Sequence, residues 1–473
     1  MPRRVLLLLT FALVALCLQA QGETQAGKRL FTDAFQPAEF AARRAKVMAA
    51  VGQGVAVISG ATEQPNYEKF KQNKQFFYLT GIEVPRAMLI IDGRAKQSTL
   101  FLPARTAAMD RSEGPLLAPG RDAQALTGIE AVVDRTTFDA AIKEIGAQAR
   151  MIFMPFRAES IGAVAPDRVL AHERATAADP WDGRKSREAV FKEKVQAVAP
   201  RSEVADLDPI LDRQRLIKSP AEIAVLREST RIASLAIAEG IKAAKVGMFE
   251  YEVEAVADFV FKKHNAMGIG YFALVATGTN AAWPHYHAAQ SRLEDGDLVL
   301  FDYAPEFKYY TSDVTRMFPA NGTFSPRQRE MYGIYVRLYQ ALLSSVGPGP
   351  AAPRLKSAYD KMTAALAAFE FKDDKVRAAA TAFVERYAAV RGTGSFGHWV
   401  GMEAHDVSGG GFDGIYKPGM VLTIEPALTI PDERVYIRLE DMIVITETGA
   451  DVLSAGLPME IEAIERLMRP AVR

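Results

Sequence analysis

The sequence predicts two folded parts, an α/β domain over residues 36–205 and an α+β domain over residues 206–473. Three observations support this division. The chain of 473 residues is too long for one ordinary hydrophobic core. Its first half alternates short apolar runs of strand length with helical stretches, which is typical of an α/β domain. Its second half opens with two amphipathic helices and continues with β-rich stretches that contain acidic residues.

The composition is typical of a soluble globular protein, with 49% hydrophobic and 24% charged residues. Lys plus Arg and Asp plus Glu both number 57, so the formal net charge is zero. Because no strong electrostatic field would attract the chain to nucleic acid or to anionic lipid, we expect neither as a partner.

The first 20 residues are predicted to be a secretory signal peptide. Arg3 and Arg4 precede an apolar run over residues 5–18, and Ala20 is a small residue suited to cleavage. The run is too short to span a bilayer comfortably. The alternative is a buried N-terminal helix, but the paired arginines before continuous apolar residues favour export. We therefore expect a secreted or periplasmic protein without a membrane anchor after cleavage.

Cys17 is the only cysteine, so cleavage after residue 20 would leave a mature chain without a thiol. A lipoprotein signal requires a small residue at the position of Leu16, so we favour signal-peptide cleavage over lipidation at Cys17. The sequence leaves the choice between the two open. Residues 21–35 are mostly small and polar and are predicted to form a flexible tether.

The α/β domain is predicted to begin with a helix that carries Phe40, Val47 and Met48 on one face. Four apolar runs are predicted strands, over residues 55–58, 87–91, 98–102 and 151–154, and residues 138–149 are helical. The domain contains no cluster of metal-ligand residue types. We expect it to support the other domain, to make oligomer contacts, or to form a wall of the site.

The second domain is predicted to begin with a helix at Ser219-Pro220, because Ser219 is a good N-cap and Glu222 stands at the capping-box position. Its apolar face is Ile223, Leu226, Thr230, Ala233 and Ile237. A second helix over residues 250–264 has the predicted stripe Val253, Val256, Phe259 and Val260. Ser325 is predicted to cap another helix, and residues 355–390 are helical.

The candidate active residues of this domain are four carboxylates and one imidazole placed among strand-like residues. They are Asp302, Asp313, His398, Glu425 and Glu440. A half-buried strand penalises an unpaired charge, so cations are needed to neutralise this set. Its net charge of −4 matches two divalent ions, and oxygen ligands with one nitrogen suit manganese, iron, cobalt or zinc. We expect a turn at Pro305-Glu306-Phe307-Lys308 to bring the two aspartates together.

These residues and their flanks resemble the pita-bread metallopeptidases, a group that includes methionine aminopeptidase, prolidase and aminopeptidase P. The similarity is carried by four motifs: SDVTR (312–316), HWVGMEAHD (398–406), TIEP (423–426) and RLED (438–441). The stretch FKQNKQFFYLTGIEVPRAMLII (70–91) resembles the N-terminal domain of aminopeptidase P. The resemblance covers nearly the whole predicted mature chain and implies a pita-bread (creatinase/aminopeptidase-like) fold for the second domain.

The resemblance also implies a role for each matching position. Asp302 would bind one metal ion, His398 and Glu425 the other, and Asp313 and Glu440 would bridge both. The implied catalytic residues are His285, which contacts substrate near the scissile bond, His405, which stabilises the carbonyl or tetrahedral intermediate, and Glu425, which accepts a proton. On the strand of Glu440, Arg438 could orient a ligand carboxylate from outside the ligand set.

Two positions depart from the family pattern. Gly394 stands where aminopeptidase P and prolidase carry another histidine, and Ala304 replaces a glycine. Neither is a predicted metal ligand, so we expect metal binding to survive. The effect of Gly394 on rate and on the preference for Xaa-Pro stays open.

The expected function is that of an exported exopeptidase with two metal ions, which removes the N-terminal residue of a peptide before proline by means of a metal-bridging hydroxide. The nearest alternative is an Xaa-Pro dipeptidase (prolidase). A metal-free, creatinase-like hydrolase is less favoured, because all five ligand positions are filled. A catalytically weak metal- or peptide-binding homologue is the alternative from another class. The physiological substrate, the native metal and formation of a homo-oligomer stay open.

Overall fold

The computed structural model describes residues 33–63, 68–158, 166–390, 394–407 and 411–469. The predicted signal peptide, with Cys17, and nearly all of the predicted tether lie outside these residues. The predicted tether includes Phe35, but this residue is fully buried and its ring lies 5.9 Å from that of Phe40. The predicted tether therefore extends too far at its C-terminal end.

The chain forms two compact units. The first comprises the described residues of Met1–Ile161 and Arg184–Leu211, and the second those of Gly162–Gly183 and Asp212–Arg473. The first unit thus ends at Leu211 rather than at residue 205. Helix α8 (Pro166–Ala178), which the sequence assigned to the first domain, groups with the second unit.

The first unit is built on a six-stranded mixed sheet in the order β4-β3-β2-β1-β5-β6. The strands are β1 Val55–Ser59, β2 Met88–Asp92, β3 Gln97–Leu102, β4 Ala131–Asp134, β5 Ile152–Met154 and β6 Val204–Asp206. The pairs β1–β2 and β2–β3 are antiparallel and the other three are parallel. The four predicted strands are present; β4 and β6 were not predicted, because both are short and only half-buried.

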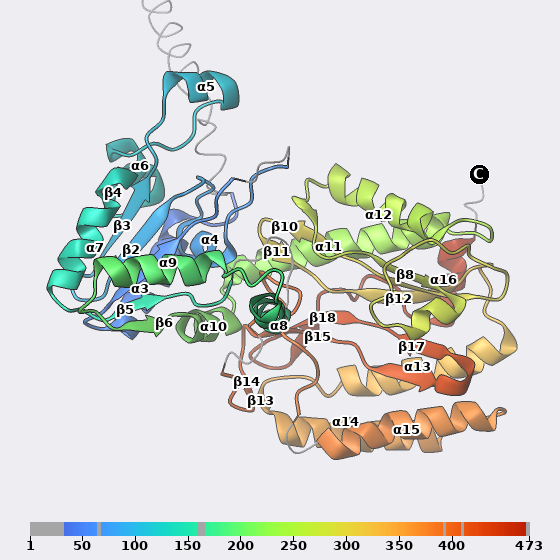
Figure 1. Ribbon diagram of the computed structural model, residues 1–473. Helices are drawn as coiled ribbons and strands as arrows, with labels where there is room; N and C mark the ends of the chain where they lie inside the picture. Colours follow the sequence, from blue (N-terminus) through green and yellow to red (C-terminus); the bar gives the residue numbers. More distant parts are fainter. Residues whose placement is uncertain (1–32, 64–67, 159–165, 391–393, 408–410, 470–473) are drawn as a thin grey trace, which may run out of the picture. The chain divides into compact units, whose positions relative to one another are not determined.

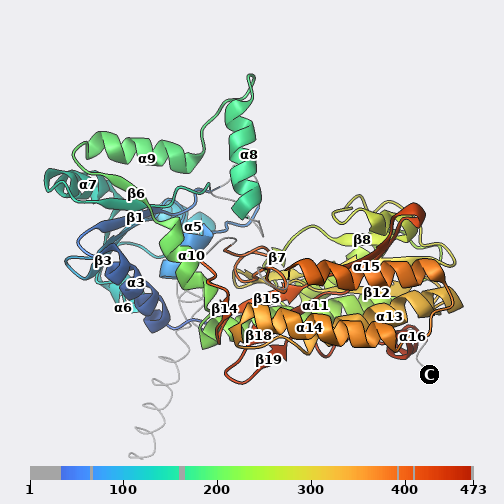
Figure 2. The same cartoon turned by 90° about the horizontal axis from the view of Figure 1, so that it is seen from below.

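Helices cover both faces of this sheet (Figure 2). On one face, α7 (Phe138–Ala147) and α9 (Arg187–Val198) pack on the side chains of Val55, Val57, Met88 and Ile90. Alternate residues of a strand point to opposite faces, and α3 (Pro37–Val51) packs on the other face. The short helices of this unit are α4 Lys74–Thr80, α5 Ala107–Glu113 and α6 Arg121–Thr127, and α10 Asp208–Leu216 runs from this unit into the second.

In the second unit, strands lie between two groups of helices (Figure 1). One group is α11 (Pro220–Ala243) and α12 (Glu250–Lys263), and the other is α13 (Pro326–Leu343), α14 (Ala351–Ala367) and α15 (Asp374–Val390). The main strands between them are β8 Leu274–Thr277, β9 Leu298–Asp302, β12 Thr315–Pro319, β15 Val421–Ile424, β16 Ala427–Ile430, β17 Val435–Arg438 and β18 Asp441–Ile445. The shorter elements are β7 Gly268–Ile269, β10 Pro305–Phe307, β11 Tyr310–Thr311, β13 Gly349–Pro350, β14 Ile415–Tyr416, β19 Ala450–Val452 and α16 Ile461–Met468.

The capping predictions are confirmed, since Ser219 and Ser325 each close a capping box at the start of a helix. The predicted stripe of α12 is wrong in one member, because the Phe259 side chain is 66% exposed. The buried face of α12 instead contains Val253, Ala257 and Val260, which follow the helical repeat more closely. Among the described residues, no helix is both long and apolar enough to cross a membrane.

The predicted turn at 305–308 is also wrong, since Pro305–Phe307 forms strand β10. The chain reverses after this strand, at Lys308 and Tyr309, whose φ angles are 49° and 69°. Strand β10 then pairs with β11.

Candidate metal centre

Strand pairing brings the five predicted ligands to one place. Antiparallel pairing of β9 with β12 sets Asp302 opposite Thr315, and Thr315 also forms an isolated bridge with Glu440. The backbone N–H of Thr423 donates to the carbonyl of His398 at 2.9 Å, which holds the His398 segment beside β15. Residues more than 130 positions apart therefore meet because of β-sheet register.

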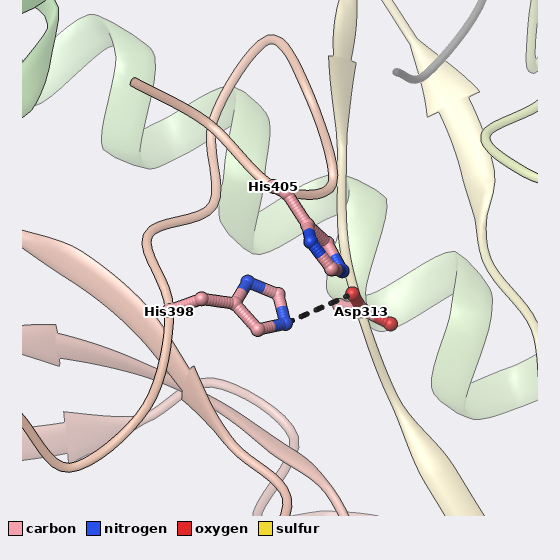
Figure 3. Close-up of side chains that lie close together, drawn as sticks. All are labelled: Asp313, His398 and His405. Carbon is pink, nitrogen blue, oxygen red and sulfur yellow. Dashed lines mark ion pairs between the residues drawn. The ribbon is translucent and has the colours of Figure 1, made fainter. Parts of the chain in front are cut away.

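Their ligand atoms form three overlapping groups, and within each group the atoms lie within 4.8 Å of one another. The groups are Asp302, Asp313 and Glu440; His398, Glu425 and Glu440; and Asp313, His398 and His405. The Nε2 atom of His398 lies 3.1 Å from Glu425 Oε1, 3.7 Å from Asp313 Oδ2 and 4.0 Å from Glu440 Oε1. Figure 3 shows the imidazoles of His398 and His405 beside the Asp313 carboxylate.

Burial makes this carboxylate cluster costly. Asp302, Asp313 and Glu440 are 3%, 6% and 1% exposed. Burial, reinforced by the charge of Asp302, raises the pKa of Asp313 to about 8. Burial and the neighbouring carboxylates raise the pKa of Glu440 well above its usual range. These shifts show that the protein groups alone do not compensate the negative charge.

The pKa of Glu425 is lowered, in contrast to the pKa values of Asp313 and Glu440. Burial alone would raise its pKa, but His398 and the Arg438 guanidinium outweigh burial and lower the pKa to about 2. The proximity of Glu425 likewise raises the pKa of His398 against the opposing effect of burial. The Nε2 atom of His398 nevertheless has no partner with hydrogen-bond geometry among the described residues.

These residues fit divalent metal ions. Carboxylate oxygens crowd one buried space, and a buried imidazole nitrogen without a hydrogen bond is directed into it. Two divalent cations would offset four carboxylates, whereas the single guanidinium of Arg438 does not. The donor set does not select one metal.

Arg438 bonds to two of the predicted ligands. Its Nη1 donates to Glu425 Oε2 at 3.2 Å, and its Nη2 contacts Asp302 Oδ2. The guanidinium thus ties together one ligand from each of the two predicted metal positions, and it can fix their orientation from outside the ligand set.

The two predicted catalytic histidines occupy different environments. The ring of His405 lies 4.1 Å from that of His398, inside the cluster. His285 is exposed and belongs to none of the three ligand groups. Its ring nitrogens lie 3.1 and 3.2 Å from Arg168 Nη2 on α8. Desolvation and the charges of Arg168 and Arg438 lower the pKa of His285.

Sequence reasoning missed three residues that hydrogen-bond to the ligands. The hydroxyl of Tyr271 lies 2.6 Å from Asp302 Oδ1 and 2.7 Å from Asp313 Oδ1. The hydroxyls of Thr315 and Thr423 donate to the two oxygens of Glu440, at 2.7 and 3.0 Å. Both threonines lie in motifs that the sequence analysis identified, so the sequence could have pointed to them. The residues around Tyr271 contain no motif that would have done so.

The loop that carries His285 is organised by another missed residue, Glu250, which is fully buried. One carboxylate oxygen accepts from the Thr277 N–H at 2.8 Å and from Asn280 Nδ2 at 3.0 Å. The other accepts from the Tyr286 hydroxyl at 2.8 Å and from the Ser291 N–H at 2.9 Å. Because one side chain satisfies four donors across 15 residues of loop, it determines where this loop lies.

Glu250→Gln is expected to destabilise the protein and to lower turnover while leaving metal content unchanged. The glutamine NH₂ group would face two donors in place of an acceptor, which costs about 2–3 kcal/mol in the free energy of unfolding. Denaturant unfolding, metal analysis and kcat/KM measure the three quantities. The matched control is Glu252→Gln, also in the first turn of α12 but exposed. If both variants lose the same stability, Glu250 does not organise the loop.

Comparison with known proteins agrees with this geometry. Residues 224–447 match Metallopeptidase family M24, and residues 40–153 match the Aminopeptidase P, N-terminal domain. The Xaa-Pro aminopeptidase of Escherichia coli (strain K12) is 31% identical over 414 residues, which are 84% of this chain and 89% of that protein. The chain belongs to metallopeptidase family M24. The Xaa-Pro aminopeptidase of Haemophilus influenzae is 30% identical over 451 residues, 91% of this chain and 97% of that protein.

Solved structures of this family share the fold. Aminopeptidase P from E. coli with the inhibitor Pro-Leu superposes with a TM-score of 0.70 at 27% identity, covering 92% of this chain and 98% of that one. Proline aminopeptidase P II from Yersinia pestis gives 0.70 at 28% identity, covering 92% and 99%. The predicted fold class is confirmed as an aminopeptidase P N-terminal domain followed by a pita-bread domain. This M24 member is an Xaa-Pro aminopeptidase-like hydrolase, and its family implies divalent metal ions.

Proposed function

We propose that the chain is an exported aminopeptidase that uses two divalent cations, with manganese as the first candidate, and a hydroxide shared between them to remove an N-terminal residue that precedes proline. The observation that carries this proposal is the convergence of four carboxylates and His398 in one buried cluster, with His405 beside it. The names of the curated relatives supply the Xaa-Pro substrate class.

Each side chain has a role that its position permits. Asp302, Asp313 and Glu440 would hold one ion, and His398, Glu425 and Glu440 the other; Asp313 also lies 3.7 Å from the Nε2 atom of His398. Bound divalent ions would supply Lewis acidity and lower the pKa of a water molecule. Glu425, whose pKa is lowered to about 2, is ionised at neutral pH, so its carboxylate could hold an ion; its role as proton acceptor is proposed on the family resemblance and not on this pKa. His405 can donate to the oxygen on which negative charge develops.

The test of the reaction is a peptide panel with a His405 variant. Xaa-Pro-Xaa peptides are expected to be hydrolysed at the first bond and Xaa-Pro dipeptides to be poor substrates; the reverse order would indicate a prolidase. His405→Ala is expected to lower kcat about a hundredfold or more, because one stabilising donor is lost, while metal content stays unchanged. Stoichiometric metal without turnover of any peptide would instead favour the binding homologue.

Gly394 lies in the described segment before His398. The resemblance to aminopeptidase P and prolidase would place a histidine at this position. We expect this position to modulate specificity rather than metal binding, so Gly394→His should change relative rates across the panel without changing metal content.

Export rests on the sequence of the first 20 residues alone. Cleavage after Ala20 predicts a mature protein that begins at Gln21. Mass spectrometry of the N-terminus from the secreted or periplasmic fraction checks this, and a lipid-modified Cys17 at the N-terminus would contradict it.

A further inference from the structure

A cavity of about 750 Å³ lies in the first unit. It is bounded by α7 and α9 and by the residues that precede β2, and it lies on the sheet face that these two helices cover. This volume is within the usual range for sites that bind small molecules. All its lining residues belong to the first unit, whereas the whole metal centre belongs to the second.

The floor of the cavity is apolar. Buried side chains of Met88, Ile142 and Val195 form its base, and these residues belong to the main core of the unit. The rings of Phe138 and Phe191 stack at 6.2 Å along the lining and are only partly buried. An apolar surface of this kind gains free energy when an apolar body covers it.

The lining carries four cationic side chains and one acidic side chain. The cations are Arg86, Arg135, Arg187 and Lys194, and the acid is Asp139. Asp139 is already neutralised, because its Oδ2 lies 2.6 Å from Lys143 Nζ on the next turn of α7. Arg86 pairs with Glu63 at 2.8 Å. The cavity therefore keeps an excess of positive charge.

The excess charge resides mainly on Arg135 and Lys194. Both side chains are exposed, and neither forms an ion pair within the part of the chain that the structure describes. Arg187 donates to the Gly60 carbonyl, which fixes its guanidinium at the cavity. Cations around an apolar floor select a ligand that has one anionic end and an apolar body.

We propose that this cavity binds a small organic anion with an apolar body, such as a medium-chain fatty acid or an aromatic carboxylate. None of its lining residues belongs to the metal centre, so binding at the cavity does not require peptide hydrolysis.

The test uses the full mature chain and 1-anilinonaphthalene-8-sulfonate as a fluorescent probe, with decanoate and uncharged decanol as competitors. The wild-type protein is expected to bind the probe at one saturable site, and decanoate is expected to displace it at concentrations at least tenfold lower than decanol. Arg135→Glu/Lys194→Glu is expected to weaken probe binding at least tenfold. The matched control is Lys46→Glu/Arg121→Glu, which makes the same two charge reversals at exposed positions of the same unit outside the cavity.

A second variant tests the apolar floor without a change of charge. Val190→Trp places a large side chain at a lining position that is 36% exposed, so it can fill the cavity with little strain on the core, and it is expected to abolish probe binding. Peptidase activity and melting temperature are expected to stay at wild-type values in all variants. Wild-type affinity in both cavity variants, or equal displacement by decanol and decanoate, would overturn the proposal.

Discussion

Asp313→Asn is expected to abolish metal-dependent activity, with a loss of at least about a thousandfold in kcat/KM, because the cluster loses a carboxylate that belongs to two of the three ligand groups. Asp313 belongs to the group with Asp302 and Glu440 and to the group with His398 and His405. An amide keeps the volume of the side chain but is a much poorer metal ligand. Several kcal/mol of transition-state stabilisation by metal ions correspond to this loss in rate.

In the absence of metal, Asp313→Asn should increase the stability of the fold rather than impair the protein. Burial raises the pKa of Asp313 to about 8, above its unfolded value of about 3.9. A carboxyl group whose folded pKa is raised destabilises the fold progressively as the pH rises from about 4 through 8. The metal-free variant lacks this penalty and should be more stable than the metal-free wild type at neutral pH.

Metal addition separates the two effects. The wild-type protein should gain about 2.7 kcal/mol of stability for each ion bound when the metal concentration is a hundred times the Kd of that site, and the variant should gain much less. Thermal unfolding with and without metal, together with metal analysis, measures both. A variant that binds two ions per chain, or that is destabilised without metal, would contradict the role of Asp313.

Much of the fold was predictable because its local signals are strong. The capping boxes at Ser219 and Ser325 and the four apolar strands of the first unit follow from local sequence. The stripe of α12 was wrong at Phe259 because a large apolar side chain suggests burial whether or not it lies on the packed face. The turn after Asp302 was misplaced, since Pro305 lies in a strand and the chain reverses at Lys308 and Tyr309; proline is common in turns but also occurs in short strands.

The residues of the site likewise differ in how far the sequence predicts them. The five ligands could be recognised because their residue types conflict with their strand-like surroundings. Tyr271 and Glu250 could not, since a tyrosine after glycine and a glutamate at the start of a helix are ordinary in sequence. Their importance comes from partners 27 to 42 positions away, which only the tertiary structure brings close.

Asp406, the residue after His405, is also held by a network that the sequence did not reveal. Its carboxylate lies 2.5 Å from Arg215 Nη2 and 3.0 Å from Lys218 Nζ, and Arg215 also contacts Glu403 at 3.0 Å. Arg215, Lys218 and Asp406 are each at most 4% exposed. This buried network anchors the segment that carries His405 to the chain just before α11.

Asp406→Asn is expected to lower the free energy of unfolding by about 3–5 kcal/mol at neutral pH, because two buried cations lose their shared partner. It should also lower kcat, since the His405 segment loses its anchor, while metal content changes little. The matched control is Asp360→Asn, whose carboxylate pairs with Lys356 on the surface and whose loss should cost less than about 1 kcal/mol. Equal losses of stability in the two variants would show that the buried network stabilises the protein no more than a surface ion pair does.

The pH dependence of this variant has a defined sign. Burial alone would raise the pKa of Asp406, but Arg215 and Lys218 outweigh it and hold the pKa below its usual range. A depressed carboxyl pKa stabilises the fold above the unfolded pKa of about 3.9, and this stabilisation is lost as the pH falls through the folded pKa. The stability gap between wild type and Asp406→Asn should therefore be widest near neutrality and narrow below about pH 4. A gap that stays constant on acidification would mean that the substitution acts through packing rather than through the charge of Asp406.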